Sequence, residues 1–258
     1  MCEIIAIANQ KGGVGKTTTA VNLGIGLVRQ GKHVLLIDAD PQGSMSAALG
    51  EEPDALSATL SDLMLKIANE EELNVDDVII HHIEGVDFIP SNIELSALEL
   101  SITNFMSREV ILRELVDPLR ERYDYILIDC MPSLGMMTIN ALAAADSVLI
   151  PVQAAHLPVI GLQQLIKTIM TVRKRLNRKL RIKGIVLTMV DMRSNLTKDV
   201  FERVHENYGD EITFETYIPM SVKAAETSAE GISIYEHAAN CKVSQAYEAL
   251  TQEVLRHE

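Results

Sequence analysis

The residues best suited to chemistry form a glycine-rich loop near the start of the chain. Residues 11–18 read Lys-Gly-Gly-Val-Gly-Lys-Thr-Thr, between an apolar run at 4–8 and a stretch of helical period at 19–29. Glycines let successive backbone N–H groups converge on phosphate oxygens, and the following helix adds its positive N-terminal end. Lys16 is placed to neutralise β- and γ-phosphate charge, and the Thr17 hydroxyl to hold Mg²⁺. The loop therefore predicts a nucleotide-phosphate site.

The loop departs from the standard phosphate-loop pattern at one position. That pattern has a glycine where this chain has Gln10. A second lysine, Lys11, stands at the mouth of the loop, five positions before Lys16. An additional fixed cation there indicates that charge is delivered to a nucleotide. A glycine-rich turn without a ligand is disfavoured, because strand, loop, Lys-Thr pair and helix all agree.

Three aspartates follow apolar runs that have the composition of strands. Asp38 and Asp40 end one such run, and Asp129 ends another. Ligands of parallel sheets bind beyond the carboxyl ends of the strands, and Mg²⁺ keeps waters that carboxylates hold. We therefore expect Asp38 and Asp129 to anchor Mg²⁺, and one of the pair Asp38 and Asp40 to orient the attacking water. An aspartate in this place is often only a helix cap or a turn former, and for each one alone that alternative stays open.

Short runs rich in Ile, Val and Leu alternate with longer stretches of helical period. The alternation predicts repeated βαβ units and the α/β class, as in P-loop NTPases, with a mostly parallel twisted sheet and helices on both faces. The expected strands are 3–9, 33–38, 86–90, 125–129, 147–152, 183–190 and 213–218. The expected helices include 59–69, 108–123, 136–145, 157–176, 198–208 and 243–256. With no repeat or linker in sight, residues 1–258 are expected to form a single domain.

Composition narrows the class of protein. The hydrophobic content of 47% is enough for one substantial core. No apolar stretch approaches the roughly 18 to 20 residues that span a bilayer, and no signal-peptide layout is present, so a cytosolic protein is expected. Cys2, Cys130 and Cys241 are widely spaced without a C-x-x-C pair, which disfavours a disulfide framework and a thiolate metal site. The formal net charge of -13 means that any contact with nucleic acid needs a local patch.

One basic patch is present between residues 167 and 183, where eight Lys and Arg residues occur without an acidic one. They are Lys167, Arg173, Lys174, Arg175, Arg178, Lys179, Arg181 and Lys183. The favoured interpretation is that the basic end of a helix complements the helix dipole and keeps the surface solvated. A contact with nucleic acid is the alternative.

These features together closely resemble the ParA/Soj/MinD family of P-loop ATPases, whose phosphate loop carries the additional lysine seen here as Lys11. The resemblance covers nearly the whole chain. Besides the loop, the matching segments are Asp38-Ala-Asp-Pro-Gln-Gly, Asp129-Cys-Met-Pro-Ser-Leu-Gly, Thr138-Ile-Asn-Ala-Leu, Ile150-Pro-Val-Gln and Leu187-Thr-Met-Val-Asp-Met-Arg193. The details are most similar to the short Soj-type partition ATPases, which lack an N-terminal helix-turn-helix domain, and we expect none here because the loop begins eleven residues from Met1.

The resemblance implies a homodimer that closes around two ATP molecules. Lys11 of each subunit would reach into the other subunit's site, Lys16 would act on the phosphates, and Asp40 would position the water. It assigns the nucleotide to Lys11, Gly12, Gly13, Val14, Gly15, Lys16, Thr17 and Thr18, with adenine near Met189 and Pro219. It assigns Mg²⁺ to Thr17, Asp38 and Asp129. Hydrolysis is expected to be Mg²⁺-dependent and slow, which would make ATP both the glue of the dimer and its timer.

The resemblance also implies non-specific binding of double-stranded DNA by the ATP dimer. The matching positions are Arg193 and Lys223, whereas Met220 and Ser221 stand where relatives often have Arg-Asn. The implied partner is a ParB-type centromere-binding protein that stimulates hydrolysis. The protein is then expected to be a cytoplasmic, nucleoid-associated chromosome or plasmid partition ATPase, without a membrane partner.

Three other classes of protein are alternatives. A MinD-like, membrane-associated positioning ATPase needs a basic amphipathic C-terminal helix, and residues 242–258 carry three Glu against two basic residues. An iron–sulfur carrier needs gathered cysteines, and Cys130 is alone in its motif. A P-loop synthetase or small-molecule kinase needs an acceptor site, for which the sequence has no signature.

Overall fold

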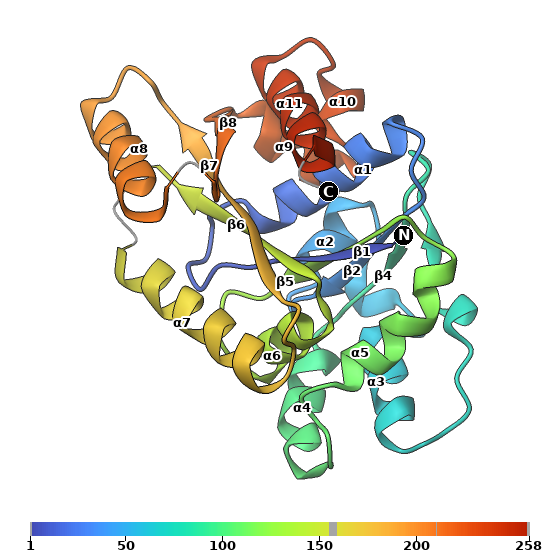
Figure 1. Ribbon diagram of the computed structural model, residues 1–258. Helices are drawn as coiled ribbons and strands as arrows, with labels where there is room; N and C mark the ends of the chain where they lie inside the picture. Colours follow the sequence, from blue (N-terminus) through green and yellow to red (C-terminus); the bar gives the residue numbers. More distant parts are fainter. Residues whose placement is uncertain (1, 155–158, 210, 257–258) are drawn as a thin grey trace.

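An eight-stranded twisted sheet runs through the molecule in the order β3-β4-β2-β5-β1-β6-β7-β8 (Figure 1). The computed structural model describes residues 2–154, 159–209 and 211–256. All neighbouring strands are parallel except β3 and β4, which are antiparallel. The strands are β1 (Glu3–Ile7), β2 (Val34–Ala39), β3 (Ile80–His81), β4 (Asp87–Ile89), β5 (Tyr125–Cys130), β6 (Ser147–Gln153), β7 (Arg181–Val190) and β8 (Thr213–Pro219).

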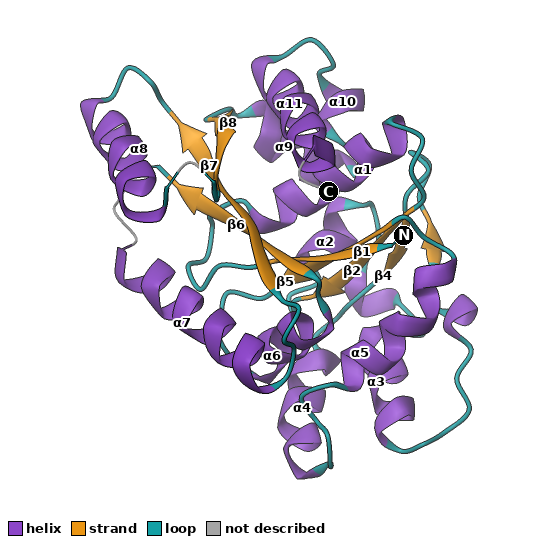
Figure 2. Cartoon of the chain, viewed as in Figure 1, coloured by secondary structure: helices purple, strands orange, loops and turns teal. Residues whose placement is uncertain are grey.

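Helices cover both faces of this sheet (Figure 2). They are α1 (Lys16–Arg29), α2 (Ser44–Ala48), α3 (Leu60–Ala68), α4 (Glu94–Ser101), α5 (Ile111–Val116), α6 (Met136–Ala144), α7 (Val159–Arg175), α8 (Asn195–Tyr208), α9 (Lys223–Glu230), α10 (Ile234–His237) and α11 (Lys242–Arg256). Short 3₁₀ segments are η1 (Pro53–Ala55), η2 (Val75–Asp77), η3 (Ile102–Asn104) and η4 (Asp117–Glu121). Among the helices that the structure describes, none combines the length and apolar character that a membrane span requires.

The central strands are buried on both sides because successive side chains point to opposite faces. On β1, Ile4 and Ala6 belong to the core beneath α3 to α8, whereas Ile5 and Ile7 belong to the core beneath α1, α2, α10 and α11. The two helical layers therefore hold β1, β2 and β5 in a fixed register. This register fixes the positions of the loops that follow the carboxyl ends of β1, β2 and β5.

The predicted fold class is confirmed: the sheet is mostly parallel and has helices on both faces. The seven predicted strands are all present within a few residues, but β3, α2, α4, α9 and α10 were not predicted. The prediction of one helix over 108–123 was wrong. That segment forms α5 and then η4, because Pro118 lacks the N–H that would continue the hydrogen bonds of an α-helix. The first two residues of the predicted helix 157–176 lie outside the described residues.

Candidate functional site

The glycine-rich loop joins β1 to α1 and leaves backbone N–H groups available at the start of the helix. Gly13 has a φ of 71° and Gly15 a φ of 84°, in the left-handed region that favours glycine. Gly15 is the N-cap of α1, and no side chain caps the helix there. Free N–H groups and the helix dipole together make this end a site for anions.

Two side chains from distant strands fix the shape of the loop. The Thr188 hydroxyl, at the end of β7, donates a hydrogen bond to the Val14 carbonyl oxygen at 2.8 Å. The Asn9 side chain accepts from the Lys11 N–H at 3.0 Å and donates to the Pro151 carbonyl oxygen of β6 at 2.7 Å. The loop is thus tied to β6 and β7, which makes its geometry rigid before any ligand binds. Neither Thr188 nor Asn9 was predicted as a site residue, although Thr188 lies in one of the matching segments.

The two lysines of the loop have different surroundings. Lys16 is the first residue of α1 and is 6% exposed. Lys11 is half-buried, and its Nζ donates to the neutral Gln153 Oε1 at the end of β6, at 3.0 Å. Because this partner is not a carboxylate, the charge of Lys11 is not neutralised there. The site therefore holds one enclosed cation and a second one at its mouth.

Asp129 is the side chain whose environment most clearly calls for a cation. It is the penultimate residue of β5, lies opposite Asp38 in the register of β2 and β5, and is 1% exposed. Neither of its carboxylate oxygens has a hydrogen-bond partner among the described residues. Burial, and then the charge of Asp38, raises the pKa of Asp129 to about 8, while the nearby Thr17 hydroxyl, which does not reach hydrogen-bond geometry, and the positive charge of Lys16 act in the opposite direction. An unpaired buried carboxylate of this kind is costly, and a divalent cation would relieve the cost.

Asp38 has a structural role that the sequence left open. Its Oδ2 accepts hydrogen bonds from the Met45 and Ser46 N–H groups and from the Ser46 hydroxyl, at 3.1, 2.9 and 2.8 Å. Its Oδ1 accepts from the Asp40 N–H at 3.2 Å. The carboxylate therefore holds the start of α2 and the turn that carries Asp40. Its role as a metal ligand stays a prediction.

Asp40 lies in the turn after β2 and is 9% exposed. Its Oδ1 accepts a hydrogen bond from the Gln42 N–H at 3.0 Å. The turn thus has a defined shape at the edge of the site, and the assignment of Asp40 to the attacking water stays a prediction.

The oxygen atoms around the phosphate loop suit Mg²⁺. The Thr17 hydroxyl and the Asp129 carboxylate would hold the ion, through water where needed, with Asp38 behind them. Among the described residues, His, Cys, Asp and Glu side chains form no group of three or more that could hold a metal ion.

The residues predicted for adenine lie together at the carboxyl ends of β7 and β8. Val190 pairs with Pro219 in the register of these strands, and Met189 is the preceding residue. Met189 has a φ of 53°, a left-handed conformation that non-glycine residues rarely adopt. Such local strain is concentrated at functional sites. The adenine assignment itself stays a prediction.

The two residues predicted for DNA follow the same strand ends. Arg193 lies just after β7, and its side chain is 91% exposed. Its guanidinium group donates two hydrogen bonds to the Asp191 carboxylate, at 2.9 and 3.1 Å. Lys223 is exposed and is the first residue of α9, which follows β8. Both cations are therefore on the nucleotide edge of the sheet, but Arg193 already has an acidic partner.

A parallel sheet whose first strand leads through a glycine-rich loop into a helix, with a buried lysine and strand-end aspartates beside it, defines a P-loop nucleotide-binding protein. A sequence profile described as "AAA domain" matches residues 2–182. The chain is 42% identical to the sporulation initiation inhibitor protein Soj of Bacillus subtilis, over 98% of each chain. It is 41% identical to the chromosome partitioning protein ParA of Caulobacter vibrioides, over 99% of this chain and 95% of the other. The chain belongs to the ParA/Soj family of P-loop ATPases.

A solved structure of similar fold carries the expected ligands. It is a cobyrinic acid a,c-diamide synthase from Mycobacterium smegmatis with a bound ATP analogue and magnesium. The TM-score is 0.88 at 32% identity, with 100% of this chain and 95% of that chain covered. The prediction of ATP and Mg²⁺ as the ligands of this fold and loop is confirmed by such neighbours.

Proposed function

We propose that this protein is a DNA-partition ATPase whose subunits close around two ATP molecules. The observation that carries the proposal is the pair of lysines in one phosphate loop, Lys16 enclosed and Lys11 at the mouth with a neutral partner. One lysine suffices to neutralise a terminal phosphate within a subunit. A second lysine, Lys11, lies at the mouth of the loop and, among the described residues, has no acidic partner there. Its charge is therefore available to a phosphate that is bound by another subunit.

The side chains divide the work of hydrolysis. The N–H groups of the loop and Lys16 hold the phosphates, and Lys11 of the partner subunit adds positive charge to the transferring group. Asp40, held by Asp38 and Gln42, positions the attacking water. Thr17 and Asp129 would hold Mg²⁺, which would supply positive charge to the phosphates. A cation supplied in trans contributes roughly 10³- to 10⁵-fold to such reactions, so pairing and turnover are coupled.

DNA binding is the second part of the proposal. Arg193 and Lys223 of two subunits would contact phosphates of double-stranded DNA without reading sequence. If these four side chains made all the contacts, the log–log dependence of affinity on salt would have a slope of about −3.6. Loss of the γ-phosphate removes what both Lys11 side chains grip, and the dimer and its DNA contacts then separate. A ParB-type partner would trigger this step, and the protein would be cytoplasmic and nucleoid-associated.

Retention on DNA tests this proposal. Purified protein with ATP and Mg²⁺ is passed over immobilised non-specific duplex at low salt, beside the Lys16→Ala and Asp40→Ala variants. We expect retention of the wild type and of Asp40→Ala, which keeps ATP, and loss of the ATP-dependent retention in Lys16→Ala. Folded, nucleotide-bound wild-type protein that is not retained would contradict the proposal.

The alternative of a MinD-like membrane ATPase is disfavoured by the packing of α11. Val243, Tyr247, Leu250 and Val254 form the apolar face of this helix, and all four are buried in the core against α1 and β8. The helix therefore has no free apolar face for lipid. Co-sedimentation with anionic liposomes in the presence of ATP, without retention on DNA, would reverse this ranking.

A synthase-type activity is the remaining alternative, because the M. smegmatis structure of similar fold has that name. An acceptor-dependent synthase would release little phosphate from ATP until its acceptor is added. A partition ATPase would instead turn over slowly with ATP alone and faster with DNA and its partner. Phosphate release with and without non-specific duplex separates the two activities.

A further inference from the structure

A surface of uncompensated positive charge lies at the end of α7 and in the turn that follows it. We define the basic ridge as five exposed residues, Arg173, Lys174, Arg175, Arg178 and Lys179. In the part of the chain that the structure describes, none of these five side chains has a hydrogen-bond or ion-pair partner. Unpaired cations this close together repel one another, which is notable in a protein of net charge -13.

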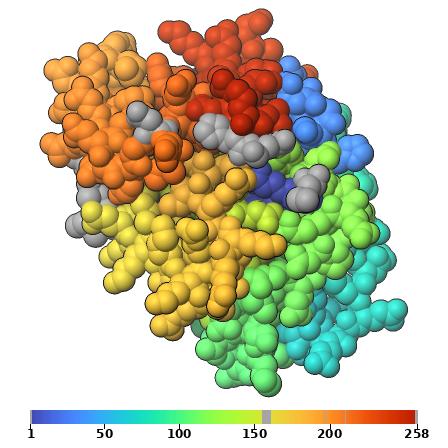
Figure 3. Space-filling model, viewed as in Figure 1, coloured from blue at the N-terminus to red at the C-terminus, as the bar shows by residue number. Residues whose placement is uncertain are grey.

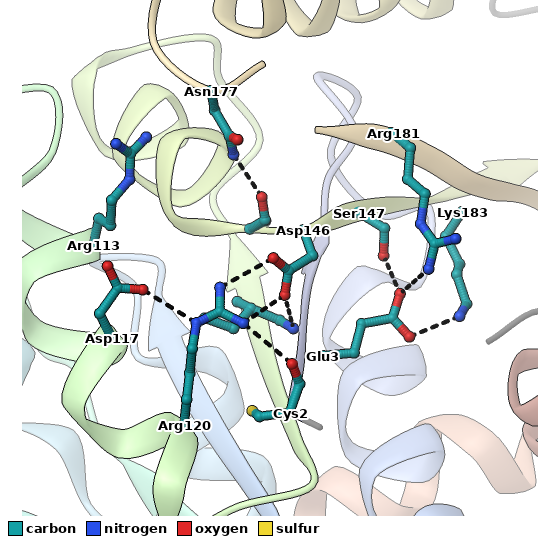
Figure 4. Close-up of polar contacts among 12 residues, drawn as sticks. Cys2, Glu3, Arg113, Asp117, Arg120, Asp146, Ser147, Asn177, Arg181 and Lys183 are labelled. Atoms are coloured by element: carbon teal, nitrogen blue, oxygen red, sulfur yellow. Dashed lines mark hydrogen bonds and ion pairs between the residues drawn. The ribbon is translucent and has the colours of Figure 1, made fainter. Parts of the chain in front are cut away.

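The other basic residues near the start of β7 are paired, which sets the ridge apart. Figure 4 shows Arg181 and Lys183 at the Glu3 carboxylate, at 3.0 and 2.8 Å. Arg120 is bound in the same region by Asp146 and Asp117. Arg120, Arg181 and Lys183 are therefore neutralised by ion pairs, in contrast to the ridge.

The ridge is on the edge of the sheet opposite the nucleotide site. Helix α7 begins after the carboxyl end of β6 and ends before the amino end of β7, so its basic end lies at the amino edge. Ten residues of β7 separate that edge from the turn of Arg193, which is about 30 Å at the rise of a strand. The Debye length is about 8 Å at physiological salt. The ridge and the pair Arg193 and Lys223 therefore act as independent charges.

Two simpler explanations account for only part of the ridge. Arg173, Lys174 and Arg175 are in the last turn of α7 and complement its dipole. Arg178 and Lys179 come after the helix has ended, so the dipole does not explain them. Lys179 also lines a cleft of about 930 Å³, but acidic residues line the same cleft. The cleft is therefore not an anion-binding pocket that would account for the charge of the ridge.

The chemistry of the ridge favours a regular polyanion as its ligand. The nearby exposed apolar side chain is Met170, and no aromatic residue occurs between 167 and 183. Binding of single strands relies on aromatic stacking, and protein partners are anchored mainly by buried apolar or aromatic side chains. Long flexible cations alone contact phosphates without reading bases. We propose that the basic ridge is a second contact for the phosphate backbone of duplex DNA, independent of the nucleotide site.

This inference deepens the proposed function and has its own consequence. Because the ridge lies far from the phosphate loop of its own subunit, its contact with DNA does not require ATP. The protein should then show two modes of DNA binding, an ATP-dependent one and a weaker, salt-sensitive one that persists without nucleotide. The face that carries α7 and the start of β7 is open to solvent in Figure 3, where these segments are yellow to light orange.

The test compares two double charge reversals. Arg178→Glu with Lys179→Glu removes ridge charge in an exposed turn, and Lys242→Glu with Arg256→Glu makes the same change of net charge on exposed positions of α11. Retention on non-specific duplex is measured across salt, with and without ATP and Mg²⁺. At about −0.9 per phosphate contact, we expect the salt slope of the ridge variant to be less steep by about 1.8 per subunit, and its affinity at low salt to fall about tenfold or more. The α11 variant should match the wild type in both slope and affinity.

The nucleotide-independent mode provides the second readout. Lys16→Ala should keep weak retention at low salt, and adding the ridge reversal should abolish it. A neutral variant, Arg178→Gln with Lys179→Gln, should lie between the wild type and the reversal while unfolding at the same temperature as the wild type. Equal retention of the ridge and α11 variants would overturn the inference, as would retention of wild-type protein with ATP but none by Lys16→Ala. Absence of wild-type retention under all conditions would instead refute the proposed function.

Discussion

Replacement of Asp129 by asparagine tests whether this carboxylate is poised for a cation. In the nucleotide-free protein, burial raises the pKa of Asp129 from 3.8 to about 8, and that of Asp38 to about 6. Because the native pKa of each exceeds the unfolded one, the unfolded state releases its proton first. The contribution of each carboxyl group to the free energy of unfolding is therefore fully present below its unfolded pKa. It is lost as pH rises through its native pKa.

The size of the effect follows from Asp129 alone. Between pH 4 and pH 8, each pH unit lowers the free energy of unfolding by about 1.4 kcal/mol. From pH 6 to pH 7.5 the loss is then about 2 kcal/mol, or about 4 to 8 °C in Tm for a chain of this size. Asp129→Asn cannot ionise and should lose most of this pH dependence, so that the variant is more stable than the wild type at pH 8.

The assay is thermal unfolding of nucleotide-free protein at intervals from pH 5.5 to 8.5, a range that crosses the native pKa of Asp129 and ends just above it. Asp54→Asn, the same chemical change at an exposed position, serves as the matched control and should follow the wild-type curve. The reasoning is refuted if the Tm of the wild type is constant across this range, or if Asp129→Asn and Asp54→Asn have the same pH dependence.

Three further substitutions test contacts that hold the phosphate loop and the surrounding fold in place. Thr188→Val removes the hydrogen bond to the Val14 carbonyl and should weaken nucleotide affinity by roughly 3- to 10-fold in a titration; unchanged affinity would contradict the tethering role. Glu253 of α11 is buried and accepts from two N–H groups of β8, at 2.8 and 3.0 Å, so Glu253→Ala should lower the free energy of unfolding by about 2 to 3 kcal/mol in denaturant titration and Glu253→Gln by less. Gly231 has a φ of 69°, and a Cβ there would lie 2.7 Å from the Gly50 Cα, so Gly231→Ala should destabilise by more than about 1 kcal/mol, whereas Gly161→Ala should not.

The sequence was sufficient for the sheet and for the phosphate loop because both depend on local patterns. Continuous apolar runs mark strands buried on both faces, and glycines with a following Lys-Thr mark a loop whose geometry is set by adjacent residues. The strand that escaped prediction, β3, has two residues and lies at the edge, where no apolar pattern is needed. The prediction of one helix over 108–123 gave too little weight to Pro118.

The contacts that support the site were beyond local patterns because they join segments far apart in the chain. Thr188 and Val14 are separated by 174 positions, and Lys11 and Gln153 by 142. Asp38 was predicted as a metal ligand from its place at the end of a strand, and that role stays a prediction. The hydrogen bonds that its carboxylate accepts from the start of α2 are visible only in the structure. In the basic patch, only the structure separates the paired Arg181 and Lys183 from the free ridge.

The central claim is that Lys11 acts on the nucleotide of the partner subunit, and mixing two inactive variants tests it most directly. Lys11→Ala lacks the cation given to the partner, and Asp40→Ala lacks the group that positions water in its own site. In a mixed dimer, the site of the Lys11→Ala subunit receives Lys11 from its partner and is complete. ATP turnover is measured for each variant and for their equal mixture, at saturating ATP with duplex DNA. The mixture should regain about a quarter of wild-type turnover, because about half of randomly formed pairs are mixed and each has one complete site. Turnover of the mixture no higher than the mean of the two variants would show that Lys11 acts within its own subunit and would contradict the account.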